Sequence, residues 1–421
     1  MLNKLKFLKK PKTILILIIL STAFLRLYRL DFPNKYVFDE VYHAFTAREY
    51  LKGSKEAWEW WTKPPPGVAY EWTHPPLAKE MMTASMFLSH SQDGWAWRLP
   101  GALLGSLSVY LIFLLGLNLL KSESASLLAA FIFSIDGLNF VQSRIGMNDI
   151  YMITFMLASL LFFVRKKYFL SALLVGLSFA SKWSAIYLFC MYLLIFLYDV
   201  FKLNDKSPLN IIKKYGRPTI YFIAIPLIIY LFSYLPFFLL GHSFDQFKQL
   251  QQQMWWYHTG LKATHTYSSP WWSWPLNLYP VWYFVDYQKN NVANIFTSGN
   301  TAVFWVGIGT LILTLWEAIK KRSSNLLIII TGFLVFWLPW SISPRIMFLY
   351  HFSPSVPFLA LSLAYQLNMQ LVDKKGRKLV IILLLLMIIN FVLFFPMLTG
   401  IPIPRKFVNL FFVTNLSKNP F

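Results

Sequence analysis

An acidic pair, Asp39-Glu40, directly follows the first long apolar stretch of this chain. Nine of the eighteen Asp and Glu residues lie between Asp31 and Asp93, although the formal net charge is +21. A carboxylate placed within hydrogen-bond reach of a hydroxyl group can take its proton. A basic protein that gathers half of its acids in one segment is therefore expected to use some of them in chemistry.

Cations and further polar residues stand at the ends of other apolar stretches. They are Arg26, Arg29, Arg98, Arg144, Asp149, Lys182 beside Trp183, and Arg345 close to His351. A charge inside a bilayer costs about 2.5–3.5 kcal/mol on insertion scales, so charged residues at the ends of spans are expected to have a function. Arginine holds phosphate oxygens in a planar fork and lysine supplies a compact charge. One base and a cluster of cations suffice to transfer a group from a lipid-linked phosphate, because the phosphate leaves as a stable anion.

Other chemistries find little support in the sequence. There is no Walker A loop, no GxGxxG and no serine nucleophile elbow. His258 and His265 lie seven residues apart, but no third ligand accompanies them, so we expect no metal site. The basic residues fall in short loops between apolar stretches, which is typical of topology signals and argues against nucleic-acid binding.

The elements that must position these residues are membrane spans. The chain is 57% hydrophobic with a mean hydropathy of +0.50, more than a soluble protein of this size can bury. Continuous apolar runs near 20 residues predict transmembrane helices. Eleven spans are expected at 13–30, 98–120, 125–141, 148–164, 168–182, 184–201, 218–240, 301–319, 325–342, 346–370 and 379–398.

The basic clusters orient these spans. With the N-terminal lysines in the cytoplasm, every basic loop between spans falls on the same side, as the positive-inside rule requires. The C-terminus and two long Trp- and Pro-rich loops, 31–97 and 241–300, then lie outside. We expect three regions: a catalytic module over 1–240, an aromatic-rich outer loop over 241–300, and a four-span region with an outer tail over 301–421.

The ordered motifs of the chain resemble those of the protein O-mannosyltransferases, polytopic enzymes with the C-type glycosyltransferase fold. The resemblance covers nearly the whole chain. It rests on Phe38-Asp39-Glu40, Arg26, Thr73-His74-Pro75-Pro76-Leu77-Ala78-Lys79, Arg98-Leu99-Pro100, Ser143-Arg144 through Asp149, Ser181-Lys182-Trp183, Ala263-Thr264-His265, Trp271-Trp272-Ser273-Trp274 and Tyr350-His351-Phe352. Ala78 stands where the family motif has glycine.

The resemblance implies an inverting transfer of mannose, or a related sugar, from a polyprenyl-phosphate donor to Ser or Thr hydroxyls of exported proteins. It makes Asp39 the general base, with the catalytic-site residue Glu40 positioning the acceptor or the base. It assigns the donor phosphate to Arg98, with Arg26 supporting either the acidic loop or the phosphate, and with Arg144 and Lys182 as further phosphate contacts. The remaining substrate-binding candidates are His74, Lys79, Asp149, Trp183, His265 and Arg345.

The outer loop 241–300 is too short for the β-trefoil domain that eukaryotic members carry, which suggests a prokaryotic member and leaves the acceptor open. A same-fold enzyme acting on a lipid or glycan acceptor is one alternative, and a lipid-linked sugar transporter is another of a different class. We expect a multi-pass plasma-membrane protein with membrane lipids around it, an extracytoplasmic site, no nucleic-acid partner and no cofactor beyond the lipid-linked donor. The sequence does not indicate the oligomeric state.

Overall fold

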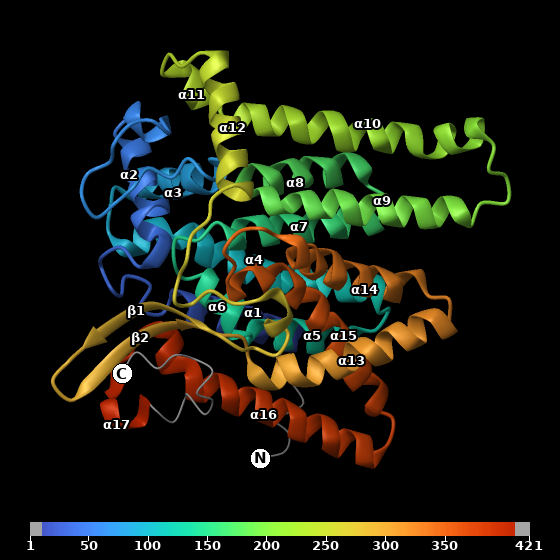
Figure 1. Cartoon of the computed structure of the whole chain (residues 1–421). Coiled ribbons are helices and arrows are strands. Elements are labelled where there is room, and N and C mark those ends of the chain that lie inside the picture. Colours follow the sequence, from blue (N-terminus) through green and yellow to red (C-terminus); the bar gives the residue numbers. More distant parts are fainter. Residues whose placement is uncertain (1–10, 409–421) are drawn as a thin grey trace.

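A computed structural model describes residues 11–408 of the chain (Figure 1). The basic N-terminal segment before Pro11 and the tail after Val408 lie outside the described residues. The sequence predicts a cytoplasmic N-terminus and an outer C-terminus, and both termini belong to these segments. The membrane orientation of the chain stays a prediction.

Each of the eleven expected spans coincides with helical structure. The corresponding helices are α1 (Pro11–Leu27), α4 (Gly94–Leu119), α5 (Glu123–Ser134) with α6 (Gly137–Gln142), α7 (Asp149–Val164), α8 (Tyr168–Ser181), α9 (Ile186–Phe201), α10 (Pro208–Ser233) with α11 (Leu235–Leu239), α13 (Thr301–Lys320), α14 (Ser324–Trp337), α15 (Val356–Gln370) and α16 (Lys374–Thr399). In the described part, six helices are long and apolar enough to cross a membrane, and α5, α7 and α8 are shorter apolar helices. The number of spans and the division into three regions remain predictions.

Two expected spans are broken by local polar chemistry. Asp136 interrupts the stretch 125–141, because its carboxylate caps α6 by accepting from the backbone N–H of Asn139 at 2.9 Å. The same carboxylate accepts from the N–H of Asn300 at 3.4 Å, which ties α6 to the start of α13. The stretch 346–370 begins as a 3₁₀ segment, Leu349–Ser355, which contains Pro354 and gives way to α15.

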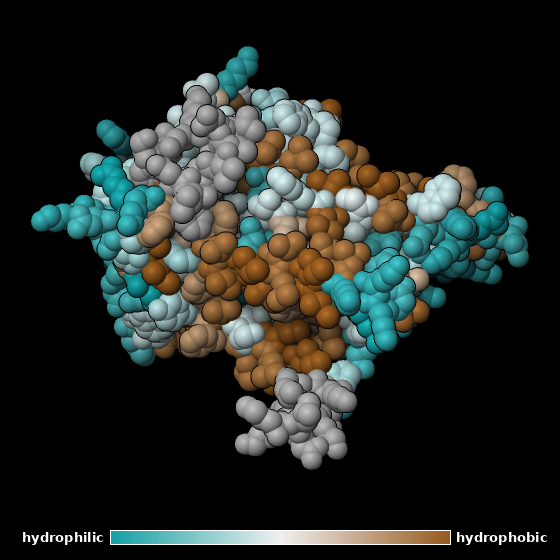
Figure 2. Space-filling view, turned by 90° about the horizontal axis from the view of Figure 1, so that it is seen from below, coloured by the Kyte–Doolittle hydropathy of each residue, from teal (hydrophilic) through white to brown (hydrophobic). Residues whose placement is uncertain are grey.

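The helices pack around a core in which α7 contacts α8, α4 contacts α5 and α7, and α15 contacts α5 and α13. The outer helices leave apolar side chains exposed; on α16 these include Ile381, Ile382, Leu385, Leu386, Ile389 and Val392. Figure 2 shows this side as a broad hydrophobic surface with hydrophilic residues toward both ends. Such a surface is stable only in contact with lipid, so the chain is a multi-pass membrane protein.

The two long loops gather at one end of the bundle. The first contains the 3₁₀ turn Phe38–Val41, α2 (His43–Leu51) and α3 (Leu77–Ser89), and the second contains α12 (Phe244–Thr259). In Figure 1 these elements lie at the end away from the loops that join α9 to α10, α13 to α14 and α15 to α16. The basic clusters lie in those joining loops. The positively charged loops and the acidic loop are therefore at opposite ends of the bundle, as the sequence predicts.

The expected all-α architecture holds for the helical bundle, and the second long loop adds a small antiparallel sheet. Strands β1 (Val281–Tyr287) and β2 (Asn291–Thr297) form an antiparallel hairpin, and β2 also pairs with β3 (Ile403–Pro404) near the short helix α17 (Arg405–Val408). β1 is rich in aromatic and β-branched residues, which favour strands. Tyr283 of β1 stacks on Phe38 with ring centres 4.2 Å apart, so the hairpin supports the acidic turn.

Candidate active site

Glu40 anchors the acidic turn inside the protein. Its side chain is fully buried and accepts hydrogen bonds from the backbone N–H groups of Val37 (2.9 Å) and Gly146 (2.8 Å) and from the indole N–H of Trp97 (3.0 Å). It also forms an ion pair with Arg98 at 2.7 Å. These partners come from the first loop, α4 and the turn before α7. Glu40 therefore fixes the backbone that carries Asp39.

Arg98 makes a complete set of contacts with the protein. Its Nε and Nη2 donate to Glu40, its Nη1 donates to the carbonyls of Leu30 and Pro33 at 3.0 Å each, and Nη2 also donates to the carbonyl of Lys35 at 3.0 Å. A guanidinium group has five N–H donors, and here all five are used. The side chain is only 1% exposed. The structure thus gives the residue assigned to the donor phosphate no free donor.

The other two arginines assigned to phosphate are also directed into the protein. Arg144 donates from Nη1 to the carbonyls of Leu25 and Arg26 and from Nη2 to that of Tyr28, at 2.7–2.8 Å. These carbonyls end α1, where a cation compensates unpaired oxygens. Arg26 is buried, and its Nε donates to the hydroxyl of Ser143 at 3.0 Å. Both side chains join α1 to the turn before α7.

Asp39 differs from its neighbour because its carboxylate is partly exposed and has no hydrogen bond or ion pair with any described residue. Burial raises the pKa of Asp39 to about 7, and the negative charges of Glu71 and Asp149 act in the same direction. The positive charges of Lys182 and Arg345 partly oppose the rise. A free carboxylate whose pKa is near neutrality is well suited to accept a proton.

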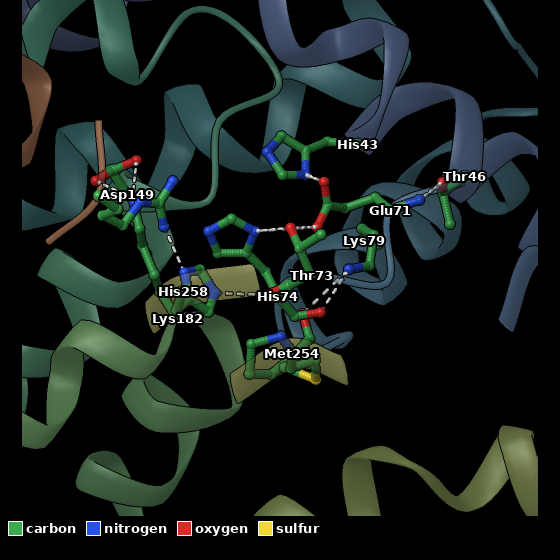
Figure 3. Close-up of polar contacts among 12 residues, drawn as sticks. His43, Thr46, Glu71, Thr73, His74, Lys79, Asp149, Lys182, Met254 and His258 are labelled. Carbon is green, nitrogen blue, oxygen red and sulfur yellow. Dashed lines mark hydrogen bonds and ion pairs between the residues drawn. The ribbon is translucent and has the colours of Figure 1, made fainter. Parts of the chain in front are cut away.

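Glu71 is a site residue that sequence reasoning missed. Its buried carboxylate accepts from the hydroxyl of Thr73 at 2.5 Å, pairs with Nδ1 of His74 at 3.0 Å, and lies 3.9 Å from Nδ1 of His43 (Figure 3). Burial opposes ionisation of Glu71, but the contact with His74, which includes the hydrogen bond from its Nδ1, holds the pKa of Glu71 well below the usual range. The one signal in the sequence was its position three residues before His74.

The ionised Glu71 fixes the tautomer of His74. Burial lowers the pKa of His74 to about 3, although Glu71 opposes the change, so the ring is neutral at pH 7. A neutral ring that donates from Nδ1 to Glu71 keeps a lone pair on Nε2, and this atom has no partner in the described chain. Lys79 is buried and donates to the carbonyls of His74 at 2.9 Å and Pro75 at 3.3 Å, which holds this segment in place.

A second ion pair lies on the other side of His74. Lys182, at the end of α8, donates to both carboxylate oxygens of Asp149 at 2.8 and 2.9 Å (Figure 3). The neighbouring Trp183 donates its indole N–H to the hydroxyl of Tyr230 at 2.9 Å. Asp149 begins α7, where a negative charge is favourable. The pair is only 2–10% exposed, so Lys182 is held in one place.

His258 of α12 links the two outer loops to the region between α14 and α15. Its Nε2 bonds to the carbonyl of Thr73 at 2.7 Å, and its Nδ1 contacts Nη1 of Arg345. Burial lowers the pKa of His258 to about 4, and the charge of Arg345 acts in the same direction. The sequence had singled out His258 only as a zinc ligand with His265. His265 is exposed, contacts Tyr267 and does not line the cavity described next.

Several of these side chains line a cavity of about 440 Å³, whereas Asp39, Glu71 and Asp149 do not line it. Its polar lining consists mainly of His74, Lys182, Trp183, His258, Arg345 and His351, and no Asp or Glu lines it. Ile186, Trp255 and Ile342 are also in its wall, and Trp255 and Ile342 are 64% and 85% exposed. The cavity therefore joins a positively charged interior to an apolar mouth, which fits a molecule with an anionic head and a hydrocarbon tail.

Comparison with known proteins places this arrangement in a family. Residues 16–240 match the family model of dolichyl-phosphate-mannose-protein mannosyltransferase, which is more than half of the chain. Residues 243–413 match the C-terminal four-span region of protein O-mannosyltransferases. The chain belongs to the protein O-mannosyltransferase family. The resemblance carried by the ordered motifs is thus confirmed.

Relatives and solved structures agree with this membership. A polyprenol-phosphate-mannose–protein mannosyltransferase of Mycobacterium tuberculosis is 23% identical over 92% of this chain and 88% of the relative, and one of Mycolicibacterium smegmatis is 24% identical. The Pmt1–Pmt2 complex of S. cerevisiae, bound to the sugar donor, superposes with a TM-score of 0.79 at 15% identity, over 93% of this chain and 90% of the other. ArnT of Cupriavidus metallidurans, bound to undecaprenyl phosphate, superposes with a TM-score of 0.60 at 14% identity, over 87% of this chain and 62% of ArnT. The C-type glycosyltransferase fold is confirmed.

Proposed function

We propose that this protein transfers a mannosyl group from a polyprenyl-phosphate donor to Ser or Thr hydroxyls of exported proteins. The names of its relatives support the donor and the protein acceptor. The observation that carries the proposal is the free carboxylate of Asp39, with a pKa of about 7, within electrostatic range of Lys182 and Arg345 of the cationic cavity. A base and an anion site are the two parts that this reaction needs.

The donor phosphate is assigned to the cavity. Arg345 supplies positive charge there, and the Nζ of Lys182, which donates twice to Asp149, keeps a third N–H for the phosphate. The apolar mouth at Trp255 and Ile342 gives the polyprenyl chain a route to the bilayer. The neutral Nε2 of His74 is available to accept a hydrogen bond from a sugar hydroxyl.

Arg98 and Arg144 receive a different role from the one first expected, and Arg26 receives one of the two roles expected of it, the support of the acidic loop. Their guanidinium groups bond to Glu40, to Ser143 and to the carbonyls that end α1. We assign them, with Glu40, to the positioning of the acidic turn. Breaking these contacts would move Asp39 without removing a group that touches the donor.

The reaction is a single displacement. Asp39 takes the proton from the acceptor hydroxyl, and the oxygen attacks the anomeric carbon of the sugar. The bond from this carbon to the phosphate oxygen breaks, and the electron pair leaves with the polyprenyl phosphate, whose charge Lys182 and Arg345 stabilise. Attack from the face opposite the leaving group inverts the anomeric carbon. The lipid-linked donor is the one co-substrate, and no metal or other cofactor is assigned.

The site is assigned to the extracytoplasmic side of a cell membrane. This orientation rests on the separation of the basic loops from the acidic ones at opposite ends of the bundle and on the positive-inside rule.

The test is transfer by the purified full-length protein in lipid nanodiscs. Polyprenyl-phosphate [¹⁴C]mannose is supplied with a Ser/Thr-rich peptide, with a glycolipid acceptor, or with no acceptor. We expect label on the hydroxyl side chains of the peptide, and none after Asp39→Asn. Asp245→Asn is the matched control, because Asp245 belongs to an exposed pair with Lys248 on the same side of the molecule. Label found on the glycolipid alone, or on neither acceptor, would overturn the proposal.

A further inference from the structure

A second cavity lies at the membrane face opposite the candidate active site. Its volume is about 420 Å³, and it is formed by the end of α7, the start of α8, the second half of α9 and the first half of α14. It shares no residue with the cavity that contains Lys182 and Arg345. The loops that follow α7 and α9 and precede α14 lie at the end of the bundle away from α2, α3 and α12 (Figure 1).

This cavity is divided into an apolar part and a polar part. Its apolar wall consists of Phe163, Val164, Leu194, Ile195, Leu327 and Ile328. Most of its polar residues lie near helix ends: Tyr198, Asp199, Ser324 and Asn325 stand nearer to a helix end than the apolar lining residues of the same helices, and Lys166 follows the end of α7. Tyr168 begins α8, and Thr331 lies deeper in α14 than Leu327 and Ile328. The polar part therefore lies toward the membrane surface and the apolar part toward its interior, which is the arrangement of a lipid.

Two lysines give the polar part a positive charge. Lys166 lines the cavity, with its backbone in the left-handed region at φ 58°. Lys202 stands at the edge: its Nζ donates to the hydroxyl of Ser324 at 3.3 Å and lies 4.3 Å from the ring centre of Tyr198. Neither lysine has an ion-pair partner among residues 11–408. A phosphate placed between them would meet two unneutralised charges.

The negative charge of Asp199 limits which anionic headgroup can bind in this cavity. Its carboxylate lines the polar part and has no hydrogen bond or ion pair within the described chain. It would repel a phosphate that stood alone beside it. A headgroup that also carries hydroxyl groups can donate hydrogen bonds to this carboxylate while its phosphate meets Lys166 and Lys202.

We propose that this cavity is a binding site for an anionic glycerophospholipid with a polyhydroxyl headgroup, of the phosphatidylglycerol type. The phosphate lies between Lys166 and Lys202, the headgroup hydroxyls donate to Asp199, and one acyl chain lies along the wall formed by Val164, Leu194 and Leu327. The site contributes no group to sugar transfer. It ties α7, α9 and α14 together at the face away from the reaction.

Native mass spectrometry of the full-length protein tests this site. The detergent-purified protein is titrated with phosphatidylglycerol and with phosphatidylcholine of identical acyl chains. We expect the wild type to retain phosphatidylglycerol at concentrations lower by about tenfold, as two lysines near a membrane surface imply. The double variant Lys166→Gln/Lys202→Gln should lose this preference. Lys374→Gln/Lys375→Gln, which removes equal charge from exposed positions at the start of α16, should keep it.

A second pair of titrations tests the role of Asp199. Asp199→Asn should weaken retention of phosphatidylglycerol and leave phosphatidic acid, which has no headgroup hydroxyl, unchanged or better retained. Equal retention of phosphatidylglycerol and phosphatidylcholine by the wild type would overturn the proposal, as would an equal loss in the Lys374/Lys375 variant. Displacement of the bound lipid by equimolar polyprenyl phosphate would assign the cavity to the reaction product instead. Retention is measured without mannosyl transfer, so the result is independent of the proposed activity.

Discussion

Replacing Asp39 by Asn should strongly slow transfer and, at the same time, stabilise the folded protein at alkaline pH. The two effects have one cause. The Asp39 carboxylate is held without a hydrogen-bond partner in a partly buried place, which raises its pKa from the ordinary 3.8 to about 7. The asparagine keeps the shape but can neither ionise nor accept a proton from a hydroxyl group.

The pKa sets the size of both effects. A carboxylate with a pKa of about 7 is mostly ionised at pH 8 and about one-tenth ionised at pH 6, so the wild-type rate should fall roughly tenfold between these values. Removal of the base should lower the rate by ~10²-fold or more at pH 8. A carboxyl group with a raised pKa favours the folded state in its protonated form. Its ionisation therefore destabilises the protein increasingly from about pH 4 to pH 7, and constantly above pH 7.

A shift of three pKa units corresponds to about 4 kcal/mol, and partial solvent exposure of the side chain reduces this to roughly 1–3 kcal/mol. Asp39→Asn should therefore be more stable than the wild type at pH 8, and the difference should shrink toward pH 4. Thermal unfolding in detergent at both pH values measures the stability, and label transfer from pH 5.5 to 8.5 measures the rate, with Asp245→Asn as the control for both. A wild-type rate that does not change between pH 8 and pH 6, or an Asn variant that is less stable than the wild type at pH 8, would refute the reasoning.

Three further predictions concern the groups around this carboxylate. Glu40→Gln breaks a buried ion pair with Arg98 and should lower the free energy of unfolding by about 3–5 kcal/mol; unchanged thermal stability would contradict the anchoring role. Arg345→Gln should raise the KM for the lipid-linked donor by about tenfold or more with a smaller change in kcat, since it removes a charged phosphate contact; an unaltered donor KM in steady-state assays would remove this residue from the donor site. Glu71→Gln removes a negative charge that raises the pKa of Asp39, so the acid limb of the rate–pH profile should move down by roughly one pH unit; a limb that stays in place would show that Glu71 does not act on the base.

The membrane architecture could be predicted from the sequence because lipid imposes a simple rule. Helices are required wherever the backbone meets hydrocarbon, and apolar runs such as 301–319 and 379–398 match α13 and α16 within a few residues. The prediction failed where polar groups are satisfied locally. Asp136 caps α6 and breaks the span at 125–141, and the sequence analysis assigned no strands to the outer loop that holds the hairpin of β1 and β2.

Only some residues of the candidate site could be predicted from the sequence. The sequence selected Asp39, His74, Asp149, Lys182 and Arg345, which the structure brings together. It also selected Arg98, whose donors are all occupied by the protein, and it missed Glu71.

The sequence by itself determined the class of this protein, because hydrophobicity, the position of basic loops and the order of motifs are all properties of the linear chain. Only the tertiary structure decided which cations can meet a ligand. Arg98 contacts Glu40, which is 58 residues away in the sequence. Lys182 contacts Asp149 over a separation of 33 residues, and Arg345 contacts His258 over a separation of 87 residues. Whether a guanidinium group is free or occupied depends on such distant partners. Their approach is fixed by the packing of the helices, so no local pattern in the sequence records it.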